Sequence, residues 1–307
     1  MSFLVSLIPA ALTLVGVVPL LGIILWWRER ERRYVRESPL TRNLLRSPGY
    51  SLREKIAGLD EQLIAHLFGI ISVPLLLFSV HVSQSYFANQ PETLLRIVLT
   101  VCVGVVFTAV IGWRLLGILN EQKIALLGLE GELATGEELN QLMLDGCRVF
   151  HDIPFPYGNI DHVVVSQSGV YSVNSKLRGK PRFGEGNAEV TVDQQQGIIK
   201  FPDRECRIPI KQFEAEANWL SQQLTSSVGR SVQVEPILAL LGWFVKERIG
   251  RGPVFVINPH KPKKFFVQNR EILTPELVQQ VAHQLEQLCR DVKPSFRKKQ
   301  ERWEDKN

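Results

Sequence analysis

Three long apolar runs fill much of the first 120 residues, and they limit the possible folds of this chain more than any other feature. The first run, Phe3 to Trp27, has no charged side chain and exceeds the roughly 20 residues that a helix needs to cross a bilayer. It has neither a basic segment before it nor a small-residue cleavage site after it. We therefore predict a retained membrane anchor and not a signal peptide.

The other two runs are Leu63 to Val82 and Ile97 to Trp113. Pro74 interrupts the second, but membrane helices that pack against partners tolerate proline. The third is short, although Arg114 can snorkel and Leu115 to Leu119 can extend it. We predict a helical transmembrane region at 1–120 with spans at 3–27, 63–82 and 97–117, and a two-span region as the alternative.

The orientation of these spans follows from the distribution of basic residues. Ser83 to Leu95 contains no Lys or Arg, whereas arginines follow the first run at positions 28, 30, 32, 33, 36, 42 and 46. Arginine-rich segments beside membrane spans stay in the cytoplasm. We therefore predict a multi-pass protein of the inner (cell) membrane with its soluble domain cytoplasmic. The four scattered cysteines lack zinc-ligand spacing and agree with a reducing compartment. Alternatively, the arginine cluster binds nucleic acid.

The remainder of the chain alternates charged, β-branched and Gly/Pro positions, as soluble globular domains do. We predict an α/β domain at 121–292 and a charged tail at 293–307. The periodicity predicts helices at 130–144, 208–226 and 274–290, and strands at 147–153, 159–166, 170–176, 235–245 and 254–258.

The strands at 159–166 and 170–176 are separated by a short turn at 167–169 and indicate a β-hairpin. Such a turn pairs residues whose numbers sum to about 335 to 337, which places Asp161 opposite Asn174 or Lys176. Because side chains alternate between the two faces of a strand, these three polar residues should share one face. The other face should carry Ile160, Val164, Tyr171 and Val173. A solvated cross-strand ion pair of Asp161 and Lys176 is the alternative to a site.

Four segments together resemble the nuclease-related domain (NERD) family: GLEGE at 128–132, GNIDHVVVSQSGVYSVNSK at 158–176, IPIKQ at 208–212 and GWFV at 242–245. The resemblance covers roughly residues 125–260. It implies a restriction-endonuclease-like α/β fold, with a mixed central sheet flanked by helices, distantly related to the PD-(D/E)xK nucleases.

In that larger group, a helix Glu, a hairpin Asp and the acid of an E-x-K motif bind Mg²⁺, while the motif Lys helps to position the attacking water. The resemblance implies catalytic roles for Glu132, Asp161, Lys176 and Gln212, and metal ligation by Glu132, Asp161 and Asn174. Asn174 stands where the motif has Glu, so one anionic ligand is missing. The implied function is Mg²⁺-dependent hydrolysis of DNA or RNA at the cytoplasmic face of the membrane. The alternatives are an inactive nuclease-like domain that binds nucleic acid or protein, and a scaffold.

Basic residues continue beyond the hairpin. Lys176, Arg178, Lys180 and Arg182 form a candidate nucleic-acid-binding segment. The glycine-rich stretch at 179–186 lacks the order of a phosphate-binding loop, and we predict no nucleotide cofactor. His162 follows Asp161 and should point to the opposite face of the strand, as a packed or hydrogen-bonded histidine and not as a catalytic base.

Overall fold

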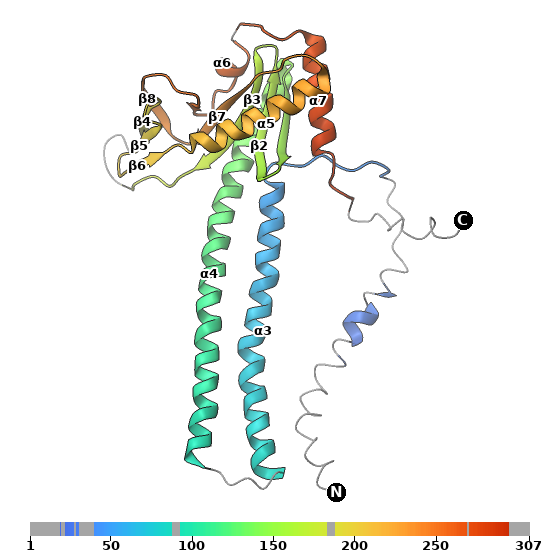
Figure 1. Cartoon of the computed structure of the whole chain (residues 1–307), viewed down its shortest axis with the longest axis vertical. Helices are drawn as coiled ribbons and strands as arrows, with labels where there is room; N and C mark the ends of the chain where they lie inside the picture. The colour runs from blue at the N-terminus through green and yellow to red at the C-terminus, as the bar shows by residue number, and fades with distance from the viewer. Residues whose placement is uncertain are drawn as a thin grey trace, which may run out of the picture. The chain divides into compact units, whose positions relative to one another are not determined.

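The computed structural model describes residues 40–87, 93–182, 188–268 and 270–294, with short pieces between 19 and 30. The chain divides into two compact units (Figure 1). One comprises Met1–Pro39, Ala57–Lys123 and Ser295–Asn307, and the other comprises Leu40–Ile56 and Ile124–Pro294. Most of the predicted span at 3–27, and the tail from residue 295, lie outside the described residues.

Two long helices, α3 (Tyr50–Phe87) and α4 (Leu94–Asn140), run side by side (Figure 1). The first unit contains their parts at 57–87 and 94–123. The side chain of Gln122 joins them by donating to Asp60 over 2.6 Å. Both helices are long and apolar enough to cross a membrane, and neither apolar window is buried. They contain the predicted spans at 63–82 and 97–117. Length and composition thus support membrane association.

Helix α4 does not end with its apolar part but continues to Asn140, and a 3-10 helix, η1 (Gln141–Asp145), follows it. The helix predicted at 130–144 is therefore the last part of α4 joined to η1. Good helix formers without proline fill the segment between, which explains the continuity. Gly131 lets α4 approach a neighbouring strand, because a Cβ there would lie 2.9 Å from the Cβ of Leu177.

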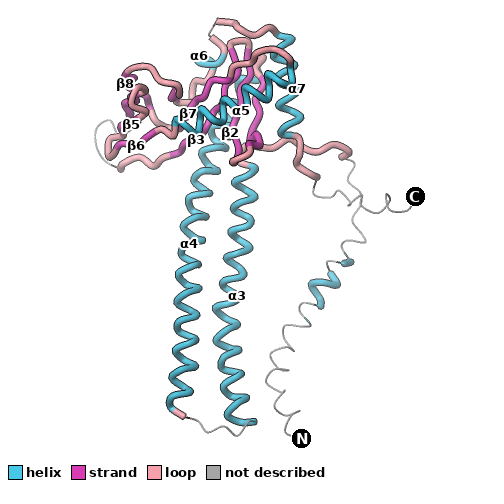
Figure 2. The backbone as a smooth tube through the Cα atoms, viewed as in Figure 1, coloured by secondary structure: helices cyan, strands magenta, loops and turns pink. Residues whose placement is uncertain are grey.

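The second unit contains the predicted mixed central sheet (Figure 2). Its strand order is β1 (Arg148–Phe155), β2 (Gly158–Ser166), β3 (Gly169–Leu177), β7 (Val234–Leu241) and β9 (Phe255–Ile257). The first three strands are antiparallel, whereas β3, β7 and β9 are parallel. The carboxyl ends of these parallel strands therefore meet at one edge of the sheet.

A smaller sheet has the order β6 (Glu205–Arg207), β5 (Ile198–Lys200), β4 (Glu189–Asp193) and β8 (Phe244–Ile249). Strands β4, β5 and β6 of this sheet are not predicted from the sequence. The single strand predicted at 235–245 is wrong beyond Leu241, because Gly242 takes a positive φ of 75° and turns the chain. Phe244 then begins β8, which pairs with β4 and not with the central sheet.

Helices α5 (Ile210–Val228) and α7 (Pro275–Cys289) pack with the central sheet in one hydrophobic cluster (Figure 1). A second cluster contains residues of α4, η1 and the short helix α6 (Lys263–Phe266). A third joins β7 and α5 to the smaller sheet. The predicted start of α7 is confirmed, because the Thr274 side chain accepts from the N–H of Leu277 and proline follows at the first helical position.

The hairpin register agrees with the prediction, since His162 pairs with Val173 and Asp161 thus falls opposite Asn174. The prediction that Ile160 and Val164 share one face of the sheet is wrong. Ile160 packs in the cluster of α5 and α7, whereas Val164 packs in the cluster that contains residues of α4, η1 and α6. The cause lies in the paired strand β1, where Asp152 has a positive φ of 53°. Val149 and Ile153, on either side of it, likewise lie in different clusters. The left-handed residue therefore interrupts the alternation of faces.

Candidate functional site

One cavity of about 400 Å³ brings together Asp161, Asn174, Lys176 and Gln212, which come from β2, β3 and α5. These are four of the five residues that the family resemblance assigns to catalysis or metal binding. Glu216, which the sequence analysis did not single out, lines the same cavity. The remaining lining residues are Tyr157, Gly158, Asn159, Ser175, Phe213 and Leu238.

Asp161 is held by the backbone of the opposite strand, because the N–H of Ser175 donates to its carboxylate over 2.7 Å. Burial is the main cause that raises the pKa of Asp161, and the Ser175 hydrogen bond partly offsets it. The neighbouring charges of Glu216 and Asp152 raise this pKa further. The cavity thus holds two acids close enough to repel each other, an arrangement that a cation would stabilise.

Glu216 is 2 % exposed and accepts two hydrogen bonds from side-chain amides. Asn174 donates to it over 2.8 Å and Gln212 over 2.9 Å. Burial raises the pKa of Glu216, and the two hydrogen bonds lower it in part. One signal in the sequence points to this residue: Glu216 lies on the apolar stripe of α5 between Phe213 and Leu220, where a charge is unusual.

Glu132 does not line the cavity, although the resemblance assigns it to the metal site. Its side chain is buried on α4 and accepts the backbone N–H of Gly49, while Oε2 has no hydrogen-bond partner among the described residues. Burial, followed by repulsion from Asp161 and Asp152, raises the pKa of Glu132. Within the described part of the chain, no group of three His, Cys, Asp or Glu residues has metal-ligand spacing. Glu132 is therefore an electrostatic neighbour of Asp161 and not a lining residue.

The four predicted nucleic-acid-binding residues have different surroundings. The side chain of Lys176 is exposed, and no described residue forms a hydrogen bond or ion pair with it. Arg178 lies over the ring of Phe201, with its Cζ 4.2 Å from the ring centroid. Lys180 approaches the ring of Trp243 to 6.0 Å. Arg182 is exposed at the end of a described segment. Arg178 thus has a packing role beside any role in binding.

A chain of hydrogen bonds behind the cavity contains two buried histidines. His162 Nε2 lies 3.0 Å from the hydroxyl of Ser175, and His162 Nδ1 lies 2.9 Å from His151 Nδ1. His151 Nε2 lies 3.0 Å from the amide oxygen of Asn140. Burial lowers the pKa of both histidines, to about 4 for His151 and well below its usual value for His162.

Two neutral histidines allow one set of proton positions in this chain, given the amide orientation of Asn140. His151 donates to Asn140, His162 donates to His151, and the Ser175 hydroxyl donates to His162. The prediction that His162 is a packed, hydrogen-bonded histidine agrees with this arrangement. Its effect is to hold Ser175, whose backbone N–H binds Asp161.

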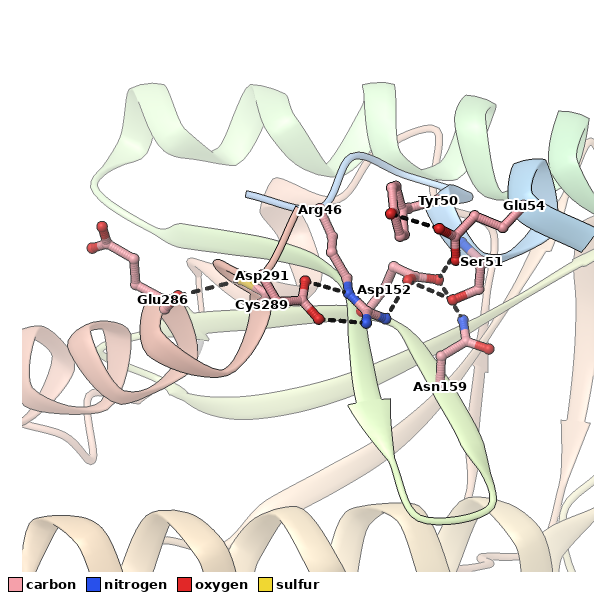
Figure 3. A network of polar contacts seen from close by, with 9 residues as sticks. All are labelled: Arg46, Tyr50, Ser51, Glu54, Asp152, Asn159, Glu286, Cys289 and Asp291. Atoms are coloured by element: carbon pink, nitrogen blue, oxygen red, sulfur yellow. Dashed lines mark hydrogen bonds and ion pairs between the residues drawn. The ribbon is translucent and has the colours of Figure 1, made fainter. Parts of the chain in front are cut away.

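A second polar network joins the segment before α3 to the central sheet (Figure 3). The fully buried carboxylate of Asp152 accepts from Arg46 over 2.9 Å, from the Ser51 hydroxyl over 2.7 Å and from Asn159 over 2.8 Å. Arg46 also forms an ion pair with Asp291 over 2.6 Å. From the sequence, Arg46 is predicted only as one of the arginines that orient the membrane spans. In the structure it binds the segment at 40–56 to the α/β unit.

The comparisons agree with the geometry of the α/β unit. Residues 127–241 match the family model of the nuclease-related domain. This part of the chain contains Glu132, Asp161, Asn174, Lys176 and Gln212, and the match indicates a nuclease-related function. No curated protein and no solved structure matches the chain. Between residues 127 and 241, the chain thus carries a nuclease-related domain, the NERD domain that the sequence resemblance predicts.

Proposed function

We propose that the domain hydrolyses phosphodiester bonds of DNA or RNA with the help of Mg²⁺, at the cavity lined by Asp161, Glu216 and Lys176. The observation that supports this most is the position of Glu216. Asn174 lacks the charge that the motif Glu would supply, and Glu216 brings a carboxylate to the same cavity from α5. The cavity therefore keeps two carboxylates despite the departure from the motif.

The donor set suits Mg²⁺, which proteins usually hold through one or two carboxylates while the ion keeps several waters. Asp161 and Glu216 would supply the carboxylates, and Asn174 and Gln212 offer amide oxygens. When bound, the ion would polarise the phosphate and lower the pKa of a bound water. The raised pKa values of Asp161 and Glu216 support this proposal, because they indicate acids confined without full compensation of charge.

The other residues have separate tasks in the proposal. Lys176 is exposed at the cavity and would bring positive charge to the scissile phosphate. Asn174 and Gln212 hold Glu216 in one orientation through their hydrogen bonds. Glu132 would act on Asp161 through its charge. A cation nearby would reduce the repulsion between these two carboxylates.

The experiment uses the full-length chain in detergent, because Arg46 and Ser51 bind the α/β unit from outside the predicted 121–292 domain. Single- and double-stranded DNA and RNA are incubated with Mg²⁺, Mn²⁺ or EDTA. Cleavage should need the metal and should be lost in Asp161→Asn and Glu216→Gln. Glu214→Gln on the same helix is the matched control, because Glu214 does not line the cavity. Equal cleavage by Glu216→Gln and Glu214→Gln would refute the role of Glu216.

A second candidate function is an inactive nuclease-like domain that binds nucleic acid or protein. Two observations favour it: Asn174 replaces the motif Glu, and the described residues contain no cluster of three acidic, His or Cys ligands. Lys176, Arg178, Lys180 and Arg182 would then hold phosphates. Metal-independent binding of nucleic acid by a protein that cleaves none of the substrates would identify this function.

For the membrane part, we propose three spans, a cytoplasmic α/β domain and a place in the inner (cell) membrane. The support is the absence of Lys and Arg from Ser83 to Leu95, compared with the arginines after the first apolar run. Arg46 is weaker evidence for this orientation than the other arginines, because its ion pairs with Asp152 and Asp291 give it a role in the fold. A reporter after Trp27 or at the carboxyl terminus should lie in the cytoplasm, and one at Asn89 should lie outside. An external carboxyl terminus would contradict three spans.

A further inference from the structure

A second cavity, of about 510 Å³, lies among β8, the end of β9 and helix α6. It is lined by aromatic and basic side chains that no role assigned above uses. They are Phe244, Phe255, Phe265, Arg248, Lys261 and Lys264. Aromatic rings beside basic groups are the combination that holds single-stranded nucleic acids.

Three phenylalanine rings line the second cavity. Phe255 and Phe265 are stacked, with their centroids 5.0 Å apart and an angle of 22° between the ring planes. Phe244 is 62 % exposed at the start of β8. An exposed phenylalanine contributes little to folding, but a nucleic-acid base can stack on it.

The basic side chains leave positive charge in the cavity. Lys261 and Lys264 are exposed, and no hydrogen bond or ion pair joins them to the described residues. The guanidinium of Arg248 lies 5.0 Å from the centroid of the Phe255 ring. By contrast, Lys263, the neighbour of Lys264, is paired with Asp145 over 2.9 Å. Lys261 and Lys264 are thus available to phosphates.

A series of contacts connects this cavity with the cavity of Asp161 along the carboxyl edge of β3, β7 and β9. Lys176 lies near the end of β3, and Lys180 beyond it reaches the ring of Trp243, which follows β7. Asn258, which follows β9 and lines the second cavity, donates to the Trp243 carbonyl over 2.8 Å. Ligands of α/β proteins commonly bind at this edge of a sheet.

We propose that the second cavity binds single-stranded DNA or RNA, with a base against Phe244 and phosphates beside Lys261 and Lys264. The strand continues along the carboxyl edge past Lys180 and Lys176 to the cavity of Asp161. The bases of a duplex are stacked on one another and do not reach Phe244, so the cavity selects single strands. The inference rests on the proposed nuclease function and specifies single strands as its substrate. Binding of a single strand to the second cavity can nevertheless be measured without hydrolysis.

The test measures binding of a labelled oligothymidine to the full-length chain in phosphatidylcholine nanodiscs, by fluorescence anisotropy in EDTA. Phe244→Ala should raise the Kd about tenfold, the loss expected for one stacked base. Ile249→Ala is the matched control, because Ile249 is 40 % exposed on the same strand but does not line the cavity. Lys264→Gln should reduce the slope of log K against log salt by about 0.7, and Lys263→Gln should leave it unchanged.

Equal binding by Phe244→Ala and Ile249→Ala would overturn the proposal. So would equal affinity of the wild type for single and double strands. If Phe244→Ala and Lys264→Gln weaken only the binding of phosphatidylserine vesicles, the cavity faces a membrane surface and the proposal is again wrong. A protein that cleaves nothing but shows the predicted effects in EDTA would refute the nuclease and support this cavity. If the wild type cleaves nucleic acid and Phe244→Ala binds oligothymidine as tightly as the wild type, the nuclease is supported and the role of this cavity is refuted.

Discussion

Asn174 on β3 donates its side-chain N–H to the carboxylate of Glu216 on α5 over 2.8 Å. By the family resemblance, Asn174 stands where the motif has Glu, and the negative charge beside it comes from the helix and not from the strand. A hydrogen bond to a charged acceptor is stronger than one between neutral groups, and it keeps Glu216 at the cavity. Substitutions of these two residues therefore test the site most directly.

In Asn174→Glu, an acceptor replaces the donor that Glu216 uses. Two carboxylates then repel each other, and we expect the variant to lose about 1–3 kcal/mol of stability in EDTA. Added Mg²⁺ or Mn²⁺ should bind the variant more tightly than the wild type and restore its melting temperature. Thermal unfolding with increasing metal measures both effects. Asn174→Glu with Glu216→Gln is the control, because it keeps the wild-type charge and should unfold in EDTA much as the wild type does.

Arg46→Met should destabilise the α/β unit by about 3 kcal/mol, because the fully buried carboxylate of Asp152 loses its cationic partner. Asp291→Asn removes the other partner of Arg46, a side chain that is 47 % exposed, and should cost about 1 kcal/mol or less. Chemical unfolding followed by tryptophan fluorescence compares the two. Equal losses would show that the Asp152 pair is no more important than the surface pair. A fragment that begins at residue 121 lacks both Arg46 and Ser51 and should lose at least as much stability as Arg46→Met.

Glu132→Gln should become more stable relative to the wild type as the pH rises. The pKa of Glu132 is raised in the folded protein, so the wild type loses stability as the pH rises from about 4.3, the usual value of an unfolded Glu, through the raised pKa. Glutamine cannot ionise and removes this loss. Melting temperatures at pH 5 and pH 8 in EDTA measure it, with the exposed Glu130→Gln on the same helix as control. A difference between variant and wild type that stays constant with pH would contradict the raised pKa.

His151→Gln should reduce the loss of stability in acid. The folded pKa of His151 is lowered to about 4, so the unfolded chain takes up this proton first as the pH falls below about 6.5. Stability is then lost between these values at up to about 1.4 kcal/mol per pH unit. Protonation of Glu132 and Asp161 acts in the opposite direction, so variant and wild type are compared at each pH. His283→Gln, exposed on α7, should follow the wild type. Parallel curves for His151→Gln and the wild type would exclude a neutral buried His151.

The sequence predicted the hairpin well because its signals are local. The turn at 167–169 sets the register, and the period of two brings Asp161 opposite Asn174. The alternation failed only at Ile160, where a left-handed Asp152 in the neighbouring strand interrupts it. The strand predicted at 235–245 failed at Gly242 for a related reason, since a single backbone angle directs the chain to another sheet.

By itself, the sequence determined the apolar helices and the hairpin that brings Asp161 opposite Asn174, because periodicity and turn chemistry act between near neighbours. The mixed sheet and the site roles of Asp161, Asn174 and Lys176 were predicted from the resemblance to the NERD family. Only the tertiary structure decided the partners of the buried charges. Glu216 lies 42 residues from Asn174 along the chain, and Arg46 lies 106 residues from Asp152. A buried carboxylate must find donors wherever packing brings them, and no local pattern records which distant segment will supply them.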